Sequence, residues 1–262
     1  MRRLNNVAIK HILGIKESIS NKFHRKTSIT SLISNTIPYE KWPTNWKKVH
    51  YKEYPRSDSL DLNPKDLPPK RGQFESILSR RRSERNFSRN QALDIKSLGQ
   101  LLNLSAGINN INQSTSLLLR AWPSAGARYP LECYILNNNI DGLEDNFSYH
   151  YNVKRISLEK LFPKQNMSKF FIELTGQEWT KNASCIVVAT AVFGRTKIKY
   201  GDRGYRYCLL DCGHLAQNIL LTCTHLNLKA CPIGGFSDKQ INDFLDLDGV
   251  NEATLYLIAI GK

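Results

Sequence analysis

The chain has 262 residues, of which 41% are hydrophobic and 23% charged, and its formal net charge is +14. This composition fits an ordinary globular protein of one large or two small domains, and it excludes collagen-like, low-complexity and wholly disordered chains. Residues 1–90 contain 20 Lys or Arg against 8 Asp or Glu, whereas residues 91–262 contain 17 against 15. A basic first third is typical of binding to an acidic partner, either peptide or nucleic acid, or of a merely solvated surface.

The sequence also contains information about the cellular compartment and about metal binding. No segment has both the length and the apolar composition of a membrane span, and Lys10 and Lys16 interrupt the apolar start, so a secretory signal is not expected. Six cysteines are too few for a disulfide scaffold in this chain, and we expect free thiols in a cytoplasmic protein. Cysteines and histidines are frequent between Cys208 and Cys231, but their spacing does not match a zinc motif, so no metal site is expected.

The first seventy residues differ from the rest of the chain. Apolar residues from Leu4 to Ile19 fall at helical spacing with lysines between them, which predicts an amphipathic helix packed on the protein body or on a partner. Residues 35–70 hold six of the ten prolines, so this stretch is expected to be an extended arm. We interpret residues 1–70 as a basic N-terminal extension and residues 71–262 as the main domain.

The main domain shows both helical and strand-like patterns. Apolar spacing predicts helices at 74–82, at 94–104 behind an Asp94 cap and at 205–226, and apolar runs predict strands at 133–136, 185–190 and 255–260. Because the run at 185–190 has no charge, we expect that strand to be covered on both faces. The predicted fold class is α+β, a mixed sheet sandwiched by helices.

Four arginines and a serine are concentrated between Arg80 and Arg85. Guanidinium groups match phosphate oxygens in a planar, bidentate way, and a serine hydroxyl adds a neutral donor. The segment indicates a phosphate site, although a solvated basic turn or a nucleic-acid contact has a similar sequence. The candidate ligand-binding residues are Arg81, Arg82, Ser83 and Arg85.

Two segments of small residues complete a possible binding site. Small side chains let the backbone approach a flat ligand closely, and a tight structural turn is the alternative interpretation of either segment. Combined with the arginine cluster, they indicate a phosphorylated planar cofactor. The two segments are Ser124-Ala125-Gly126 and Pro232-Ile233-Gly234-Gly235.

Lys199 and Tyr200 precede a stretch rich in charged and aromatic residues that leads into the long helix. A lysine or tyrosine that is partly desolvated beside a cofactor can take a proton from carbon. The alternative is a polar loop whose charges pair with one another, for example Lys199 with Asp202. The residue types alone favour this second interpretation.

Taken in order, these segments resemble the flavin-dependent nitroreductase superfamily, and within it the SagB-type dehydrogenases that oxidise azoline rings in ribosomally made peptides. The resemblance covers residues 71–262, with weaker similarity upstream at 23–27 and 51–55. The segments that carry it are Arg81-Arg82-Ser83-x-Arg85-x-Phe87, Pro123 to Glu132, Lys199-Tyr200-Gly201-x-Arg203-Gly204-Tyr205-Arg206-Tyr207, Gly213-His214-x-Ala216-Gln217-Asn218 and Gly234-Gly235-Phe236.

The resemblance implies bound FMN and a homodimer that builds each flavin site at the subunit interface. By position in the motifs, the arginine cluster would hold the phosphate and ribityl chain, Ser124 to Gly126 would line the isoalloxazine, and the backbone of Pro232 to Gly235 would face the reactive flavin nitrogen. Lys199 and Tyr200 match the pair associated with catalysis. The chain departs from general nitroreductases in having Ala127 where an amide side chain is frequent.

The resemblance further implies an FMN-dependent dehydrogenase that converts thiazolines or oxazolines of a precursor peptide into thiazoles or oxazoles, as in bacteriocin biosynthesis. Oxygen would reoxidise the flavin, and a cyclodehydratase would be the partner in a synthetase complex. A general NAD(P)H-dependent nitro or quinone reductase and a non-catalytic basic scaffold are the alternatives. Neither a nucleic acid nor a membrane is expected as a partner of the enzyme. A basic stretch that helps bind phosphate at the C-terminus of general nitroreductases is replaced here by Gly261-Lys262.

Overall fold

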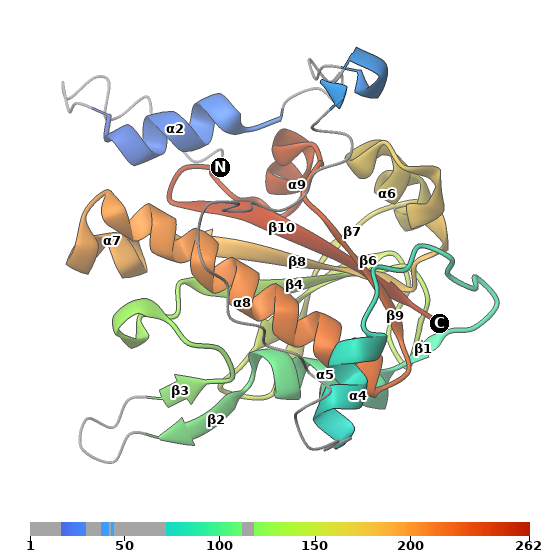
Figure 1. Ribbon diagram of the computed structural model, residues 1–262. Helices are drawn as coiled ribbons and strands as arrows, with labels where there is room; N and C mark the ends of the chain where they lie inside the picture. The colour runs from blue at the N-terminus through green and yellow to red at the C-terminus, as the bar shows by residue number, and fades with distance from the viewer. Residues whose placement is uncertain (1–16, 30–37, 42, 45–71, 112–117) are drawn as a thin grey trace.

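The computed structural model describes residues 17–29, 38–41, 43–44, 72–111 and 118–262 (Figure 1). The helices are α2 (Ile19–Thr27), α4 (Gln73–Arg80), α5 (Ile95–Ala106), α6 (Met167–Thr175), α7 (Gly194–Tyr200), α8 (Arg203–His225) and α9 (Asp238–Phe244), with 3-10 turns η1 (Tyr39–Lys41), η3 (Ala125–Ala127) and η4 (Glu178–Asn182). The strands are β1 (Leu93–Asp94), β2 (Ile108–Ile111), β3 (Leu118–Arg120), β4 (Leu131–Asn137), β5 (Ile140–Asp141), β6 (Phe147–Asn152), β7 (Ser157–Pro163), β8 (Cys185–Val192), β9 (Lys229–Ile233) and β10 (Glu252–Gly261).

A six-stranded sheet forms the centre of the protein, with the strand order β7-β6-β4-β8-β10-β9. Its neighbouring strands pair antiparallel; Val188 of β8, for example, lies opposite Tyr134 of β4 and Leu257 of β10. Parallel pairing occurs between the short strands β1 and β5, where Leu93 lies opposite Ile140. The predicted α+β class is confirmed, but the six-stranded sheet is antiparallel and not mixed, because each of its neighbouring strands runs in the opposite direction to the next.

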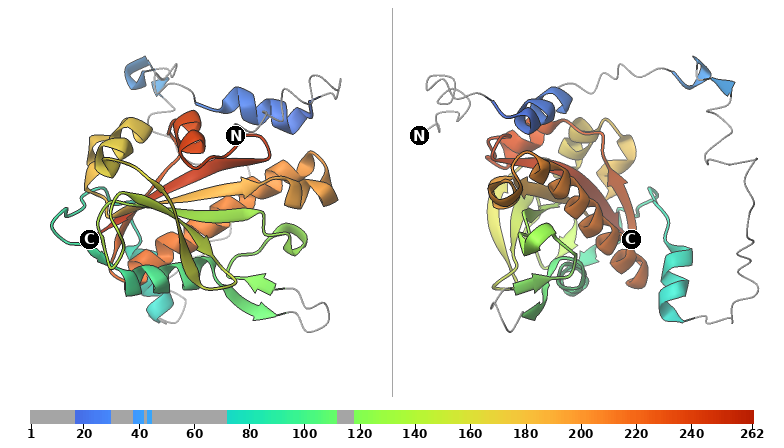
Figure 2. Two further views of the ribbon diagram at one scale, coloured as in Figure 1. Left: turned by 180° about the vertical axis from the view of Figure 1, so that it is seen from behind. Right: turned by 60° about the vertical axis from the view of Figure 1, so that its left-hand side comes forward.

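Helices cover both faces of the sheet (Figures 1 and 2). Successive side chains of a strand point to opposite faces, so β8 contributes to two cores. Val187 and Ala189 pack with α5 and α8 on one face, and Ile186 and Val188 pack with α6 and α9 on the other. The prediction that residues 185–190 form a strand buried on both faces is therefore confirmed.

The long helix α8 crosses the sheet close to the limits that the apolar spacing predicts. Its buried side chains repeat every three or four residues, as expected of a helix that packs one side on a sheet. Leu209 and Leu210 lie on the other side and are exposed. The buried stripe consists of Cys208, Cys212, Leu215, Ala216, Ile219, Leu220 and Cys223.

The two helices before the sheet also follow the sequence prediction. Asp94 caps α5, since its Oδ1 accepts from the Ser97 amide at 2.8 Å and its Oδ2 from the Ser97 hydroxyl at 2.7 Å. The helix expected at 74–82 ends at Arg80, because Arg81 has an extended ψ of 122°. The arginine cluster consequently leaves the helix and continues as extended chain.

The N-terminal extension lies mostly outside the described residues. The helix expected at 4–19 and the arm expected at 35–70 fall largely in those parts. The helix that the structure does describe, α2, packs against α7 and α8 (Figures 1 and 2). Among the described residues, no helix is long and apolar enough to cross a membrane.

Candidate functional site

The segment from Arg81 to Phe87 lies beside the edge strand β9. The Glu84 amide donates to the Ala230 carbonyl at 2.9 Å, and Lys229 Nζ donates to the Asn86 carbonyl at 2.7 Å. Phe87 is buried, with its ring 5.9 Å from that of Trp179. The backbone of the arginine segment is therefore anchored at several points while its polar side chains reach solvent.

The guanidinium groups of this segment lack carboxylate partners in the described part of the chain. Arg82 donates to the backbone carbonyls of Ser79 and Arg81 at 2.9 and 2.8 Å. Burial raises the pKa of the Cys231 thiol, and the nearby Arg85 guanidinium counteracts part of this rise. An anchored segment with uncompensated positive charge suits an anion such as phosphate.

A surface pocket of about 310 Å³ opens where this segment, α8 and β9 meet. Arg80, Arg82 and Lys229 contribute positive charge to its lining, and Glu84 contributes one carboxylate. The backbone of Lys262 accepts a hydrogen bond from the Ser88 amide at 2.6 Å, but its side-chain amine does not line the pocket and lies 3.9 Å from Asp94. The cationic groups that line this pocket thus come from the end of α4, the arginine segment and β9.

The second predicted segment, Ser124 to Gly126, forms a turn fastened to the central helix. Ser124 Oγ donates to Oδ2 of Asp211 at 2.5 Å and accepts from the Tyr129 amide at 2.9 Å. Burial raises the pKa of Asp211, and hydrogen bonds from Ser124 and the Ala125 amide oppose that rise. A buried carboxylate on α8 therefore holds the turn.

The backbone of this turn adopts conformations that require support. Gly126, Ala127 and Tyr129 have φ angles of +59°, +53° and +43°. These values lie in the left-handed region, which residues other than glycine rarely adopt. Such conformations persist only where surrounding contacts enforce them, and they cluster at ligand sites. The bonds to Asp211 and Tyr129 are contacts of this kind.

Asp211 was not among the predicted site residues. The sequence signal that could have identified it is an aspartate within the apolar stripe of a helix.

The turn meets the predicted catalytic pair. A Cβ atom placed on Gly126 would lie 2.6 Å from Tyr200 Oη and 2.8 Å from Lys199 Nζ. Both polar ends therefore converge on the bare backbone of Gly126, although the two segments lie far apart in the sequence. The absence of a side chain at Gly126 is what makes room for them.

Lys199 and Tyr200 end the short helix α7. The ring of Tyr200 meets that of Tyr207 edge to face, with 5.0 Å between the centroids, and Lys199 Nζ lies 5.4 Å from the Tyr200 ring centroid. Asp202 instead receives a hydrogen bond from Ser20 at 2.6 Å. The alternative of a Lys199–Asp202 pair is therefore not what the structure shows, and the lysine near Asp202 is Lys197, at 3.5 Å.

The third predicted segment continues from β9. Pro232 and Ile233 pair with β10, and Gly234 and Gly235 follow as exposed residues. A Cβ atom on Gly235 would have no neighbour among the described residues within 4 Å. This backbone is thus accessible from outside the subunit, as binding of a flat ligand requires.

The structure gathers the predicted residues into two groups. The arginine segment joins β9 and thereby the Pro232–Gly235 backbone, whereas Ser124–Gly126 joins Lys199 and Tyr200. No hydrogen bond or ion pair within the described chain connects the two groups. The first lies near the C-terminal half of α8 and the second near its N-terminal half, where Asp211 is located.

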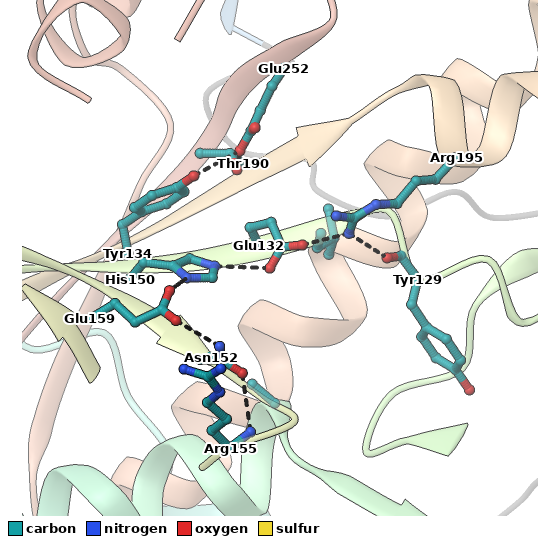
Figure 3. A network of polar contacts seen from close by, with 12 residues as sticks. Tyr129, Glu132, Tyr134, His150, Asn152, Arg155, Glu159, Thr190, Arg195 and Glu252 are labelled. Atoms are coloured by element: carbon teal, nitrogen blue, oxygen red, sulfur yellow. Dashed lines mark hydrogen bonds and ion pairs between the residues drawn. The ribbon is translucent and has the colours of Figure 1, made fainter. Parts of the chain in front are cut away.

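A polar network that sequence reasoning missed supports α7 from the sheet (Figure 3). His150 Nδ1 lies 2.9 Å from Glu159 and its Nε2 lies 3.2 Å from Glu132, and these hydrogen bonds raise the histidine pKa against the effect of burial. Burial alone would raise the pKa of Glu132, but His150 and Arg195 lower it overall. Arg195 of α7 contacts Glu132 at 2.5 Å and donates to the Tyr129 carbonyl at 3.4 Å, so it links the sheet, α7 and the Gly126 turn.

Comparisons with known proteins identify relatives of the chain. The chain is 28% identical over 205 residues to a nitroreductase of Methanocaldococcus jannaschii, covering 78% of this chain and 98% of that protein. It is 26% identical over 182 residues to the microcin B17-processing protein McbC of Escherichia coli, covering 67% of this chain. That match spans 65% of the length of McbC.

Solved structures share the fold. The E. coli microcin synthetase McbBCD complex with truncated pro-MccB17 bound contains a chain that superposes with a TM-score of 0.75 at 21% identity, covering 100% of this chain and 98% of that one. A nitroreductase from Exiguobacterium sibiricum in complex with FMN has a TM-score of 0.51 at 14% identity, covering 73% and 88%. The Nitroreductase family matches residues 78–262, and the chain therefore belongs to this family.

Proposed function

We propose that the protein is an FMN-dependent dehydrogenase that oxidises thiazoline or oxazoline rings of a ribosomally synthesised precursor peptide to thiazoles or oxazoles. The observation that carries the proposal is the convergence of Lys199 Nζ and Tyr200 Oη on Gly126. A potential base and a hydroxyl thereby meet beside a backbone turn suited to a flat ring. Family membership and the similarity to McbC support the same activity.

Two features of the chain fit FMN. Arg81, Arg82, Ser83 and Arg85 offer donors for a phosphate and a ribityl chain from a segment without carboxylate partners among the described ion pairs. The accessible backbone at Gly234 and Gly235 and the turn at Ser124–Gly126 suit the two sides of a planar ring. When bound, FMN supplies the hydride acceptor for the oxidation.

The chain's own residues account for the proton. Conversion of an azoline to an azole removes one hydride and one proton, and the proton leaves the ring carbon derived from Cα. Lys199 is the proposed base, because its amine has no ion-pair partner in the described residues and lies at the turn. Tyr200 is proposed to orient the ring, with Tyr207 packed against its edge. Molecular oxygen is the proposed final electron acceptor.

The peptide substrate and the partners are part of this proposal. A solved complex that contains a chain of the same fold is a synthetase with a bound precursor peptide, which supports a precursor peptide and a cyclodehydratase as partners here. A homodimer is supported by exposed apolar side chains on α7 and α8, namely Ile198, Leu209 and Leu210. The family resemblance implies a flavin site at the interface of two subunits, to which the two groups of site residues would both contribute.

A test starts from the purified protein with its cyclodehydratase and precursor peptide. We expect a yellow protein and, by mass spectrometry, a loss of about 2 Da from the peptide for each oxidised ring. A colourless protein that cannot be reconstituted with FMN would contradict the cofactor. A yellow protein that leaves every azoline unchanged would contradict the substrate class.

A general NAD(P)H-dependent nitro or quinone reductase is the second candidate. It is favoured by the match to a nitroreductase over 98% of that protein's length. Anaerobic addition of NADPH separates the two functions, since rapid bleaching of the flavin is expected of the reductase. Slow bleaching together with azole formation would support the dehydrogenase.

A further inference from the structure

The helix α2 packs directly on α7, which carries Lys199 and Tyr200, and on the start of α8. His24 fits between Phe193 and Tyr205, with ring centroids 5.2 and 5.8 Å away, and its Nδ1 lies 3.1 Å from Tyr205 Oη. Just after α2, Ile29 and Asp238 exchange hydrogen bonds, so the end of the helix is also fastened to the start of α9. In Figures 1 and 2, α2 lies on the side of the protein where α7 and α9 are found. This part of the N-terminal extension is thus integral to the fold.

The polar contact between α2 and α7 is made by Lys197. Its Nζ donates to Ser18 Oγ at 3.0 Å, to Ser20 Oγ at 2.8 Å and to Asn21 Oδ1 at 2.7 Å. An ammonium group has three N–H donors, so these three oxygens satisfy it completely. Asp202 adds a carboxylate 3.5 Å away, whose pKa is lowered first by its hydrogen bond from Ser20 and further by Lys197.

Lys197 and Lys199 belong to the same short helix, so the contact of Lys197 with α2 also affects the position of Lys199. Residues two apart on a helix point about 200° apart, so Lys197 and Lys199 project to nearly opposite sides. Lys197 reaches α2 on one side, and Lys199 reaches Gly126 on the other. A helix of seven residues has little stability of its own, and its position depends on such tertiary contacts.

We infer that α2 is a strap that positions the catalytic pair: through Ser18, Ser20 and Asn21 it holds Lys197, and thereby sets where α7 presents Lys199 and Tyr200. Arg195 provides a second fastening, to the sheet and the Gly126 turn. Lys197 is a positioning residue, since its donors are used within the chain. The expected effect on turnover rests on the proposed function, whereas the expected effect on the position of α7 does not.

Lys197→Met tests the strap because it keeps the aliphatic stem and removes the three hydrogen bonds. We expect the amides of α7 to exchange with deuterium about tenfold faster, since hydrogen bonds to a charged group are lost. In azoline oxidation we expect kcat to fall about 10- to 100-fold with KM and flavin content unchanged, as displacement of catalytic groups predicts. Lys22→Met is the matched control, because Lys22 lies on an exposed face of α2.

Two further variants test whether the loss of kcat arises from the hydrogen bonds between Lys197 and α2. Asn21→Ala should lower kcat in the wild-type background and add little in Lys197→Met, because both changes break the same bond. Lys197→Arg retains donors for the oxygens of α2 and should restore part of kcat. Unchanged exchange of α7 in Lys197→Met, or additive effects of the two substitutions, would overturn the strap. If the wild-type protein oxidises no azoline, the proposed function fails, and the exchange measurement alone decides the inference.

Discussion

Ser124 and Asp211 form the hydrogen bond that ties the site to the protein core: Ser124 Oγ donates to a buried carboxylate on α8 at 2.5 Å. The same hydroxyl accepts from the Tyr129 amide at 2.9 Å. The turn that carries Gly126 is thereby fixed to α8, the longest helix in the described part of the chain. Displacement of this turn would also displace the surface on which Lys199 and Tyr200 converge.

Asp211→Ala should destabilise the protein and loosen the turn. The substitution leaves the Ser124 hydroxyl and the Ala125 amide without their acceptor, which typically costs about 1–3 kcal/mol of the free energy of unfolding. Urea denaturation measures this loss. Asp211→Asn retains an acceptor oxygen and should lose less; equal losses in the two variants would contradict the clamp.

Gly126→Ala should impair the site more than the fold. The left-handed backbone, with φ +59°, strains any side chain, and the new methyl would overlap Tyr200 Oη and Lys199 Nζ. We expect about 1–3 kcal/mol of destabilisation and a larger relative loss of turnover. The control is Gly99→Ala in α5, where the methyl meets no described atom within 4 Å and should stabilise the helix by up to about 1 kcal/mol. Turnover at the wild-type level in Gly126→Ala would place the catalytic pair elsewhere.

Arg81→Ala and Arg85→Ala should weaken FMN binding. A charge-assisted contact is worth about 1.5–3 kcal/mol, so each variant should lose one to two decades of affinity, measured as the flavin-to-protein ratio after gel filtration. Arg155→Ala removes an equal charge from an exposed turn and should retain the flavin. Full retention of flavin in both cluster variants would move the phosphate site away from this segment.

Lys199→Ala and Tyr200→Phe should separate chemistry from cofactor binding. Both variants should keep their flavin, whereas azole formation should fall by about 10²–10⁴, the usual contribution of a general acid or base. The measurement is the rate at which the peptide loses mass. Near-normal rates in both variants would reduce the pair to a structural role.

The network around His150 should make stability depend on pH. Glu132 and Glu159 raise the pKa of His150 in the folded state, with Arg195 beside Glu132 and the Tyr134 ring 5.2 Å away. A histidine whose pKa is raised on folding contributes stability that is fully present below the unfolded value of about 6.5 and is lost as pH rises through the folded value. His150→Gln should therefore reduce stability more at pH 5.5 than at pH 8.5, measured by thermal unfolding. An equal loss at both pH values would show that the network does not titrate with folding.

Local sequence patterns were sufficient for the elements with strong periodicity. The helices near Asp94 and Leu215 and the strand near Val187 could be predicted, because apolar spacing and burial coincide there. Weaker strands such as β6 and β7 escaped prediction, since polar and charged side chains interrupt their alternation. Helix α4 ends at Arg80, and the chain that follows bonds through the Glu84 amide to Ala230, a long-range contact that no local pattern indicates.

For the site, residue chemistry predicted guanidinium groups for a phosphate and small residues for a flat ring. The proposed role of Lys199 and Tyr200 came from the family resemblance, because their residue types alone favoured a polar loop. Only the tertiary structure decided which contacts their side chains make. Lys197 and Lys199 have the same chemistry, yet one is saturated by α2 and the other reaches Gly126. The physical reason is that a side chain's role depends on which distant segments pack around it, and α2, α7 and the Gly126 turn meet only in the folded chain.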